Sequence, residues 1–310
     1  MLKKGDFVRH TKQDIDIKLG LGILVEDQYG DRARVYFENE LRTLEMDLTR
    51  ASLVCIDNPG DSASFLENAL YEDKGDRVPF PQILEKFLED FEGGFYGRVY
   101  EHYERDDKVQ MHQFVMENLS KECFEEALTT GTFDEITKAI QKSYSLKGFS
   151  LLATFEMMKI HTAFKEPQNL RELVMTYYDL LYGDSSVGER LEKARRSLDK
   201  FEMAKWPIIT FPLFARYPEH YLFVKPEMTQ KAALNRGFNI EYSSQVNAGT
   251  YQRILDFAKD LKNRLSSDAR EALTPRDMID VQGFMWCTFA VGWSPEGIQT
   301  AKLEAERGDF

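Results

Sequence analysis

The first 57 residues alternate short apolar runs with turn-forming residues, and this pattern constrains the fold more than any other feature of the chain. Five segments indicate β-strands: GDFVRH, GLGILVEDQ, ARVYFE, LRTLEM and SLVCI. The turn Tyr29-Gly30-Asp31-Arg32 joins the second segment to the third, with a glycine available for positive φ. Five short strands in one stretch predict a small closed barrel, because closure removes exposed strand edges.

The hydrophobic period changes from that of strands to that of helices near Pro81. Ile83, Leu84, Phe87 and Phe91 fall at the spacing that places them on one helix face. Further helices are predicted near residues 148–163, 169–182, 187–203, 227–236, 248–266 and 275–290. The second part of the chain is therefore expected to be a predominantly helical body.

Three short patterns mark predicted helix starts. Residues 64–67 (SFLE) and 132–135 (TFDE) have the spacing of a capping box. Residues 274–277 (TPRD) combine an N-cap, a proline at the first helical position and an acid in the first turn. Residues 221–224 are expected to form a short strand between helices.

These patterns predict an α+β protein with two main parts. The expected divisions are a barrel at 1–57, a linker with a short helix at 58–80, a helical domain at 81–295 and a flexible tail at 296–310. The linker is predicted from the turn formers around Pro59, and the better candidate for the domain boundary is the polar stretch at 71–81.

Composition favours a cytoplasmic protein with reduced thiols. No run reaches the roughly 18 apolar residues that span a bilayer, and the N-terminus lacks the apolar stretch of a signal peptide. The three cysteines, Cys55, Cys123 and Cys287, are widely separated, so we predict neither a disulfide framework nor a cysteine-based zinc site.

The net charge of −12 is unevenly distributed. Residues 58–130 carry 7 basic and 17 acidic side chains, whereas residues 131–310 carry 24 of each. The acidic middle segment is interpreted as a solvated helical surface. The alternative is an acidic DNA mimic, which requires carboxylates spaced like phosphates on one face.

The N-terminal strands resemble an SH3-like barrel of the Tudor, KOW and CarD kind, and the barrel at the end of UvrD-type helicases. The resemblance is carried by residues 4–10 (KGDFVRH), 20–24 (GLGIL) and 34–37 (RVYF), while the insert at 13–18 is longer and more acidic than a minimal loop. Members of these groups bind RNA polymerase, other proteins or nucleic acid. The resemblance therefore implies docking without naming the partner.

The C-terminal half resembles helical regions that accompany McrB-type ATPases of bacterial restriction and defence systems. The matching motifs are KWPIIT at 205–210, FVKP at 223–226 and PRDMIDVQ at 275–282. No ATPase core is present in this sequence, so the resemblance implies a bacterial or phage-borne accessory protein. Antiviral defence and transcription are the contexts that it suggests.

The predicted binding surface lies on the barrel. Polar and aromatic side chains near strand edges can supply both charge and stacking, and the candidates are Arg9, His10, Tyr29, Arg34 and Tyr36. Because side chains alternate faces along a strand, Tyr36 and Phe37 are not both expected in the core. We expect at least one of them to be exposed or to cover the barrel end.

No catalytic motif is recognised in the chain. Neither a Walker pattern nor Gly-x-Gly-x-x-Gly at a strand-to-helix turn occurs, so no cofactor is predicted. Asp277 and Asp280 lie three residues apart and could hold a metal, but a structural role is favoured for them. Glu104 and Asp106 could also hold a metal such as magnesium, but exposed charge on a helix surface is favoured for this pair. The catalytic and metal sites are accordingly predicted to be absent.

The sequence favours a non-enzymatic interaction protein that docks through its barrel. A protein partner is expected, and nucleic acid is the other partner considered; no membrane association is predicted. The alternatives are a metal-dependent nuclease or other enzyme subunit whose carboxylates meet only in the folded helical body, and the acidic DNA mimic.

Overall fold

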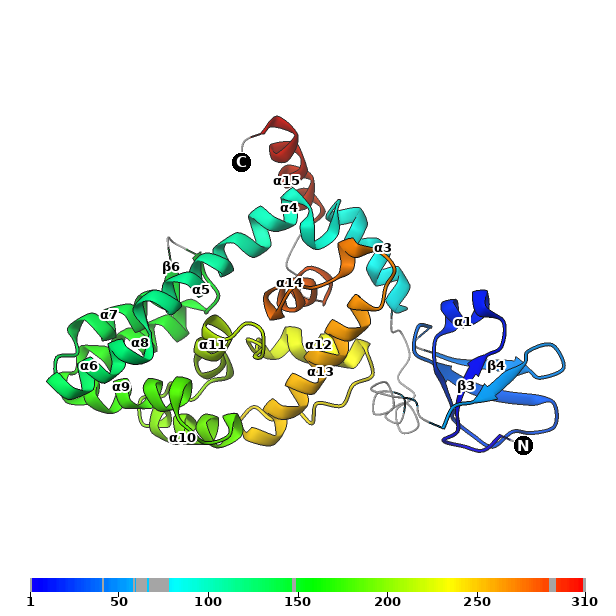
Figure 1. Ribbon diagram of the computed structural model, residues 1–310, viewed down its shortest axis with the longest axis horizontal. Helices are drawn as coiled ribbons and strands as arrows, with labels where there is room; N and C mark the ends of the chain where they lie inside the picture. The colour runs from blue at the N-terminus through cyan, green and yellow to red at the C-terminus, as the bar shows by residue number, and fades with distance from the viewer. Residues whose placement is uncertain are drawn as a thin grey trace. The chain divides into compact units, whose positions relative to one another are not determined.

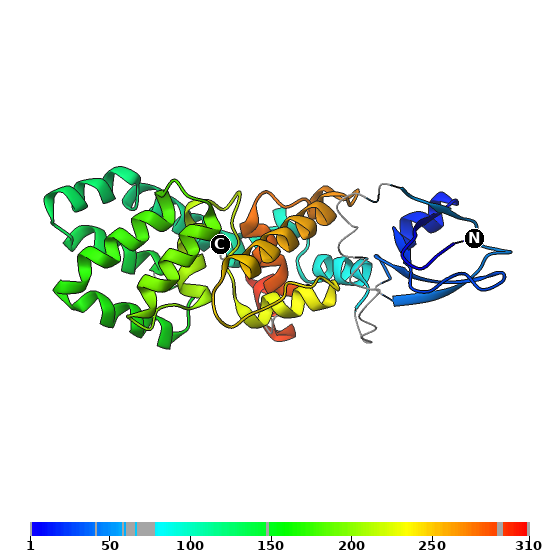
Figure 2. The ribbon, with the colours of Figure 1, turned by 90° about the horizontal axis from the view of Figure 1, so that it is seen from below.

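The computed structural model of the chain describes residues 2–40, 42–57, 59, 66, 78–146, 149–289 and 294–308. The chain forms two compact units. The first consists of Met1–Asp90 together with Gln230–Ile240, and the second consists of Phe91–Thr229 together with Glu241–Phe310. The ribbon is shown in two orientations in Figures 1 and 2.

A five-stranded antiparallel sheet forms the N-terminal part of the first unit, as predicted (Figure 1). Its strands are β1 (Phe7–His10), β2 (Gly22–Leu24), β3 (Arg32–Phe37), β4 (Arg42–Asp47) and β5 (Leu53–Cys55). Their order in the sheet is β4-β3-β2-β1-β5. With the helices that follow, the sheet confirms the α+β class.

The sheet buries apolar side chains on both of its faces. One cluster contains Val8, Val35 and Phe37, and it also includes Ile15 and Leu19 from α1 (Gln13–Leu19). The helix α1 occupies the insert that the sequence analysis treated as an acidic loop. It contributes apolar side chains to this face, which explains why so small a sheet has a substantial core.

The opposite face of the sheet carries a second cluster, which includes Tyr36, Ile23 and Leu66. Tyr36 is 5% exposed and Phe37 is fully buried. The two aromatic side chains do alternate between faces, but the expectation that at least one lies outside the core is wrong. It assumed a sheet with one buried face, whereas this sheet is covered on both.

The remaining part of the first unit comes from two distant segments. These are α3 (Phe80–Asp90) and the stretch Gln230–Ile240, which begins within α12 (Pro226–Asn235). Phe238 packs against the Tyr36 cluster, and the guanidinium of the buried Arg236 lies 4.5 Å from the centroid of the Phe80 ring. The hydrophobic pattern of the sequence instead predicts that both segments belong to the helical domain.

The second unit is mainly helical. In chain order its longer helices are α5 (Asp106–Asn118), α6 (Lys121–Thr130), α7 (Asp134–Ser143), α8 (Thr154–Lys165), α9 (Pro167–Tyr182), α10 (Val187–Asp199), α11 (Trp206–Arg216), α13 (Ala248–Ser266), α14 (Met278–Phe289) and α15 (Pro295–Arg307). Its short elements are η2 (Gly94–Tyr96), α4 (Arg98–Tyr100), η3 (Glu101–Arg105), η4 (Glu271–Leu273) and the hairpin of β6 (Ser145–Leu146) with β7 (Phe149–Ser150).

The helix α11 was not predicted from the sequence. Every residue from Trp206 to Ala215 is buried, so the helix is apolar on all sides and shows no amphipathic period. Pro207 lies in the first turn, where a backbone N–H is not needed, and Pro212 lies inside the helix. The local sequence disfavours a helix, because it contains two prolines with β-branched residues between them. Burial in the tertiary structure overrides this low helix propensity.

Three other local predictions also differ from the structure. Residues 221–224 are not assigned to a strand; the backbone N–H of Val224 donates to Thr210 Oγ1 at 3.0 Å. The TFDE box is not formed, because α7 begins after Phe133 without a side-chain cap. The predicted tail contains α15, which begins after an N-cap at Ser294 and buries Ile298 and Ala301.

Most of the predicted linker motif at 58–61, of the SFLE box and of the polar loop at 71–81 lies outside the described residues. The last two residues of that predicted loop, Phe80 and Pro81, begin α3. Within the described residues, no helix is long and apolar enough to cross a membrane.

Candidate functional site

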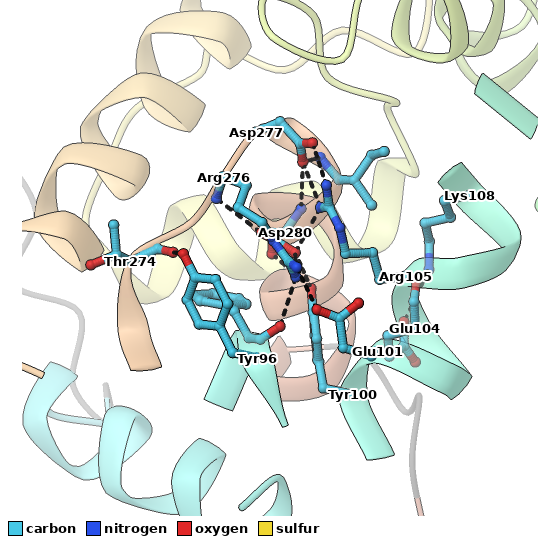
Figure 3. Close-up of polar contacts among 12 residues, drawn as sticks. Tyr96, Tyr100, Glu101, Glu104, Arg105, Lys108, Thr274, Arg276, Asp277 and Asp280 are labelled. Carbon is cyan, nitrogen blue, oxygen red and sulfur yellow. Dashed lines mark hydrogen bonds and ion pairs between the residues drawn. The ribbon is translucent and has the colours of Figure 1, made fainter. Parts of the chain in front are cut away.

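The helical stretch from Arg98 to Asn118 contains a π-helical turn, η3 (Glu101–Arg105), between α4 and α5. Such turns are rare and often occur at functional sites. Side chains from this turn meet the start of α14, more than 170 residues later in the sequence (Figure 3). The resulting set of charged side chains, Glu101, Arg105, Arg276, Asp277 and Asp280, is called the charge cluster below.

Asp277 caps the helix α14. Its Oδ1 accepts hydrogen bonds from the backbone N–H groups of Ile279 at 2.9 Å and Asp280 at 3.3 Å. The sequence predicts the cap three residues earlier, at Thr274. The acid takes this role because its carboxylate lies where the first N–H groups of the helix have no backbone partner.

Arg105 binds both aspartates of the charge cluster. Its Nη1 and Nη2 donate to the two oxygens of Asp277 at 2.9 and 2.7 Å, and Nη1 also donates to Asp280 Oδ1 at 2.9 Å. Burial disfavours the charged form of Arg105, but the hydrogen bonds to Asp277 and the two negative charges raise its pKa. The guanidinium is therefore held in its charged form.

Arg276 approaches Asp280 from the other side. Its backbone N–H and its Nε donate to Asp280 Oδ2 at 2.9 and 2.8 Å. The same guanidinium forms an ion pair with Glu101, and its Nη2 donates to the carbonyl oxygen of Phe95 at 2.6 Å. Arg276 thus joins the start of α14 to Glu101 of the π-helical turn (Figure 3) and to the short helix η2.

Asp280 is fully buried, and both of its carboxylate oxygens are occupied by donors. Besides the two arginines, the hydroxyl of Tyr100 lies 3.2 Å from Asp280 Oδ1. Burial, followed by the negative charge of Asp280, raises the pKa of Tyr100 well above its ordinary value. The phenol therefore stays protonated and acts as a donor to the carboxylate.

The charge cluster neutralises the two aspartates that the sequence offered as metal ligands. All four carboxylate oxygens of Asp277 and Asp280 accept hydrogen bonds from arginine side chains. A cation would have to displace these guanidinium groups. Within the described residues, no group of three or more His, Cys, Asp or Glu side chains is placed to hold a metal ion.

The second pair of carboxylates considered as metal ligands is not brought together. Asp106 is exposed on the surface, as expected, but the expectation of exposed charge is wrong for Glu104, which is buried and forms an ion pair with Lys108 at 3.1 Å. The two side chains therefore lie in different environments and do not form a shared site.

The five candidate residues of the sheet do not form one continuous surface. Arg9 and His10 are neighbours on β1, so they point to opposite faces; His10 is buried, and its Nδ1 accepts the backbone N–H of Lys12 at 3.0 Å. Tyr36 is also buried, and Arg34 shares its face. Tyr29 is the most exposed of the five, at 88%, and Arg34 is also exposed.

The exposed Tyr29 lies at the turn between β2 and β3. Its backbone N–H and C=O pair with those of Arg32 at 3.1 Å each, and Gly30 adopts a φ of 58°. This is the predicted hairpin, with a glycine where left-handed backbone is required. The turn holds the tyrosine away from the core.

The sequence does not reveal the charge cluster as a unit. Asp277 and Asp280 are recognisable in it, but Arg105 and Glu101 are not, because their partners lie 172 and 175 residues away. No local pattern marks such pairs. The only sequence signal was the pair of acids in an otherwise apolar helix, which requires buried countercharges from elsewhere.

Comparison with protein-family models, with curated proteins and with solved structures finds no match to this chain.

Proposed function

We propose that this protein is a non-enzymatic accessory protein that docks on a protein partner through the hairpin side of its N-terminal sheet, with the five strands closed as an SH3-like barrel. The observation that carries this proposal is the exposure of Tyr29 at the β2–β3 turn. A large aromatic side chain on a rigid turn has little conformational entropy to lose, and such residues dominate protein interfaces.

The pairing of the sheet arginines supports a protein partner over nucleic acid. Arg9 pairs with Asp16 at 3.0 Å, Arg34 pairs with Glu26 at 3.4 Å, and Arg32 pairs with Glu45. Residues 1–57 carry 9 basic and 11 acidic side chains. Phosphate binding depends on an excess of basic side chains. Residues 1–57 have no such excess.

The charge cluster supports a non-enzymatic role. Its arginines donate hydrogen bonds to the carboxylate oxygens that metal catalysis or proton transfer would require. The bonds of Arg105 also connect segments that are distant in the chain. The nuclease alternative would need these same oxygens to face a substrate. The defence or transcription context stays a prediction.

Binding measurements on the full chain test the proposal. A partner captured from bacterial extract treated with nuclease should bind the Tyr29→Ala protein at least about tenfold more weakly. Arg34→Glu should change the affinity less, because Arg34 is already paired with Glu26. Ile17→Ala is the matched control, since Ile17 is 70% exposed on α1, outside the hairpin.

Two outcomes would contradict the proposal. If Arg34→Glu abolishes binding of a DNA or RNA oligonucleotide and flattens its salt dependence, the partner is nucleic acid. If neither Tyr29→Ala nor Arg34→Glu changes partner binding, the hairpin side is not the docking surface.

A further inference from the structure

The second unit carries a groove with large exposed apolar side chains. It has a volume of about 480 Å³ and lies between α8, the start of α9 and the end of α10. Phe155 and Met158 on α8 line it and are 61% and 64% exposed, and Phe201 lines it after α10. Apolar side chains this exposed and this close together are typical of a site that another molecule covers.

An adjacent groove of about 430 Å³ lies between α9 and α10. Met175 on α9 lines it and is 47% exposed. Methionine is flexible and polarizable, so it adapts to partner side chains of different shape. Three of the exposed large apolar residues of the chain thus line these two grooves.

One ion pair separates the two grooves. Lys200 lines the first groove and Glu172 lines the second, and their side chains are 2.6 Å apart. Lys193 of the second groove precedes Lys200 by seven residues, which corresponds to about 10 Å along a helix. Ser197 also lines the second groove and lies three residues before Lys200, so the two linings follow one another along the chain. Side chains at positions i and i+7 of a helix span the same length of about 10 Å and can reach both grooves.

The charges at the grooves indicate what such a helix carries. In the first groove, Lys159 pairs with Glu202, and Glu166 accepts a hydrogen bond from Gln168 at 3.1 Å. In the second groove, Glu172 is engaged by Lys200, while Arg171 and Lys193 form no ion pair with the residues that the structure describes. These two bases outnumber the remaining acid of that groove, Asp179.

We infer that this surface, here called the double groove, binds an amphipathic helix of a protein partner. The helix places large apolar side chains at positions i and i+7 into the two grooves, and it carries an acidic side chain beside Arg171 and Lys193. The double groove belongs to the second unit alone, so this inference does not rest on docking through the sheet.

A designed peptide tests the inference directly. The probe is a fluorescein-labelled, alanine-rich helix of about 15 residues, with leucine at i and i+7 and glutamate next to the second leucine. The control peptide has the same composition with the leucines at i and i+5, on different faces. Fluorescence anisotropy with the full chain should show at least about tenfold tighter binding of the probe.

Protein variants locate the bound peptide. Met158→Glu and Met175→Glu should each weaken probe binding at least about tenfold, whereas Leu303→Glu should not change it. Leu303 is the matched control because it is 41% exposed on α15, outside both grooves. Absence of probe binding, equal binding of both peptides, or unchanged binding by both methionine variants would overturn the inference.

Discussion

Arg105 and Asp277 are joined by two parallel hydrogen bonds, Nη1 to Oδ1 at 2.9 Å and Nη2 to Oδ2 at 2.7 Å. Their side chains are only 11% and 15% exposed, so solvent screens this pair weakly. Since Nη1 also reaches Asp280, one guanidinium connects the π-helical turn to the residue that caps α14 and to an aspartate in the first turn of that helix. The geometry is that of a forked donor matched to a carboxylate, which lysine cannot reproduce.

Replacement of Arg105 by methionine should destabilise the second unit by about 3–5 kcal/mol, because it leaves two buried carboxylates without their shared countercharge. Urea unfolding of the 310-residue chain, followed by circular dichroism, measures this change. Arg105→Lys should recover only part of the lost unfolding free energy, because lysine supplies the positive charge without the two parallel N–H donors of the guanidinium.

The control for this experiment is Arg32→Met. Arg32 also pairs with an acid, Glu45, but the two side chains are 70% and 54% exposed. Exposed pairs contribute about 0–1 kcal/mol, so the free energy of unfolding should hardly change. Equal effects of Arg105→Met and Arg32→Met would show that the charge cluster does not stabilise the fold.

Gly283→Ala should destabilise the protein by about 1–3 kcal/mol through overpacking. A Cβ at this position would lie 2.3 Å from the hydroxyl oxygen of Tyr100, which is fully buried. The double variant with Tyr100→Phe should lose less stability than the sum of the two single variants, because the clashing oxygen is gone. Strict additivity in thermal unfolding would contradict this contact.

The local strand and helix patterns of the chain predict much of its fold. The five strands follow from alternation and turn residues, and α9, α10, α12 and α13 lie close to their predicted positions because each has an exposed polar side. The helix α11 could not be predicted in the same way. Its residues are buried all round, so neither a polar face nor propensity distinguishes it from a buried strand.

The candidate site was less predictable than the fold, for a related reason. Alternation along β1 separates Arg9 from His10, and the burial of Tyr36 depends on Leu66 and Phe238, which come from other parts of the chain. The charge cluster likewise depends on pairs such as Arg105 with Asp277. Local sequence identifies residues that need a partner, whereas the partner is set by tertiary packing.

The stability of the protein should fall in acid partly through Asp277. Burial alone would raise the pKa of this carboxyl, but the hydrogen bonds and charge of Arg105 lower the pKa below its ordinary value of about 4. Its contribution is therefore present above about pH 4 and is lost as the pH falls through the lowered value. Asp277→Asn should flatten this part of the pH profile of the unfolding free energy; an unchanged slope would contradict the pairing.

Alkaline pH should destabilise the protein through a buried pair of tyrosines. The hydroxyl oxygens of Tyr144 and Tyr177 are 2.9 Å apart, and that of Tyr144 donates to the carbonyl oxygen of Ile208 at 2.8 Å. Burial is the main reason that the pKa of Tyr177 is raised above its ordinary value, and it also raises the pKa of Tyr144.

Because the folded state favours neutral phenols, their contribution to stability is complete below about pH 10 and is lost progressively as the pH rises above it. The free energy of unfolding, measured in urea across this range, should fall less steeply for Tyr177→Phe than for the wild-type protein. Tyrosinate absorbance should show these two groups ionising together with unfolding. Ionisation of both in a protein that is still folded would contradict the prediction.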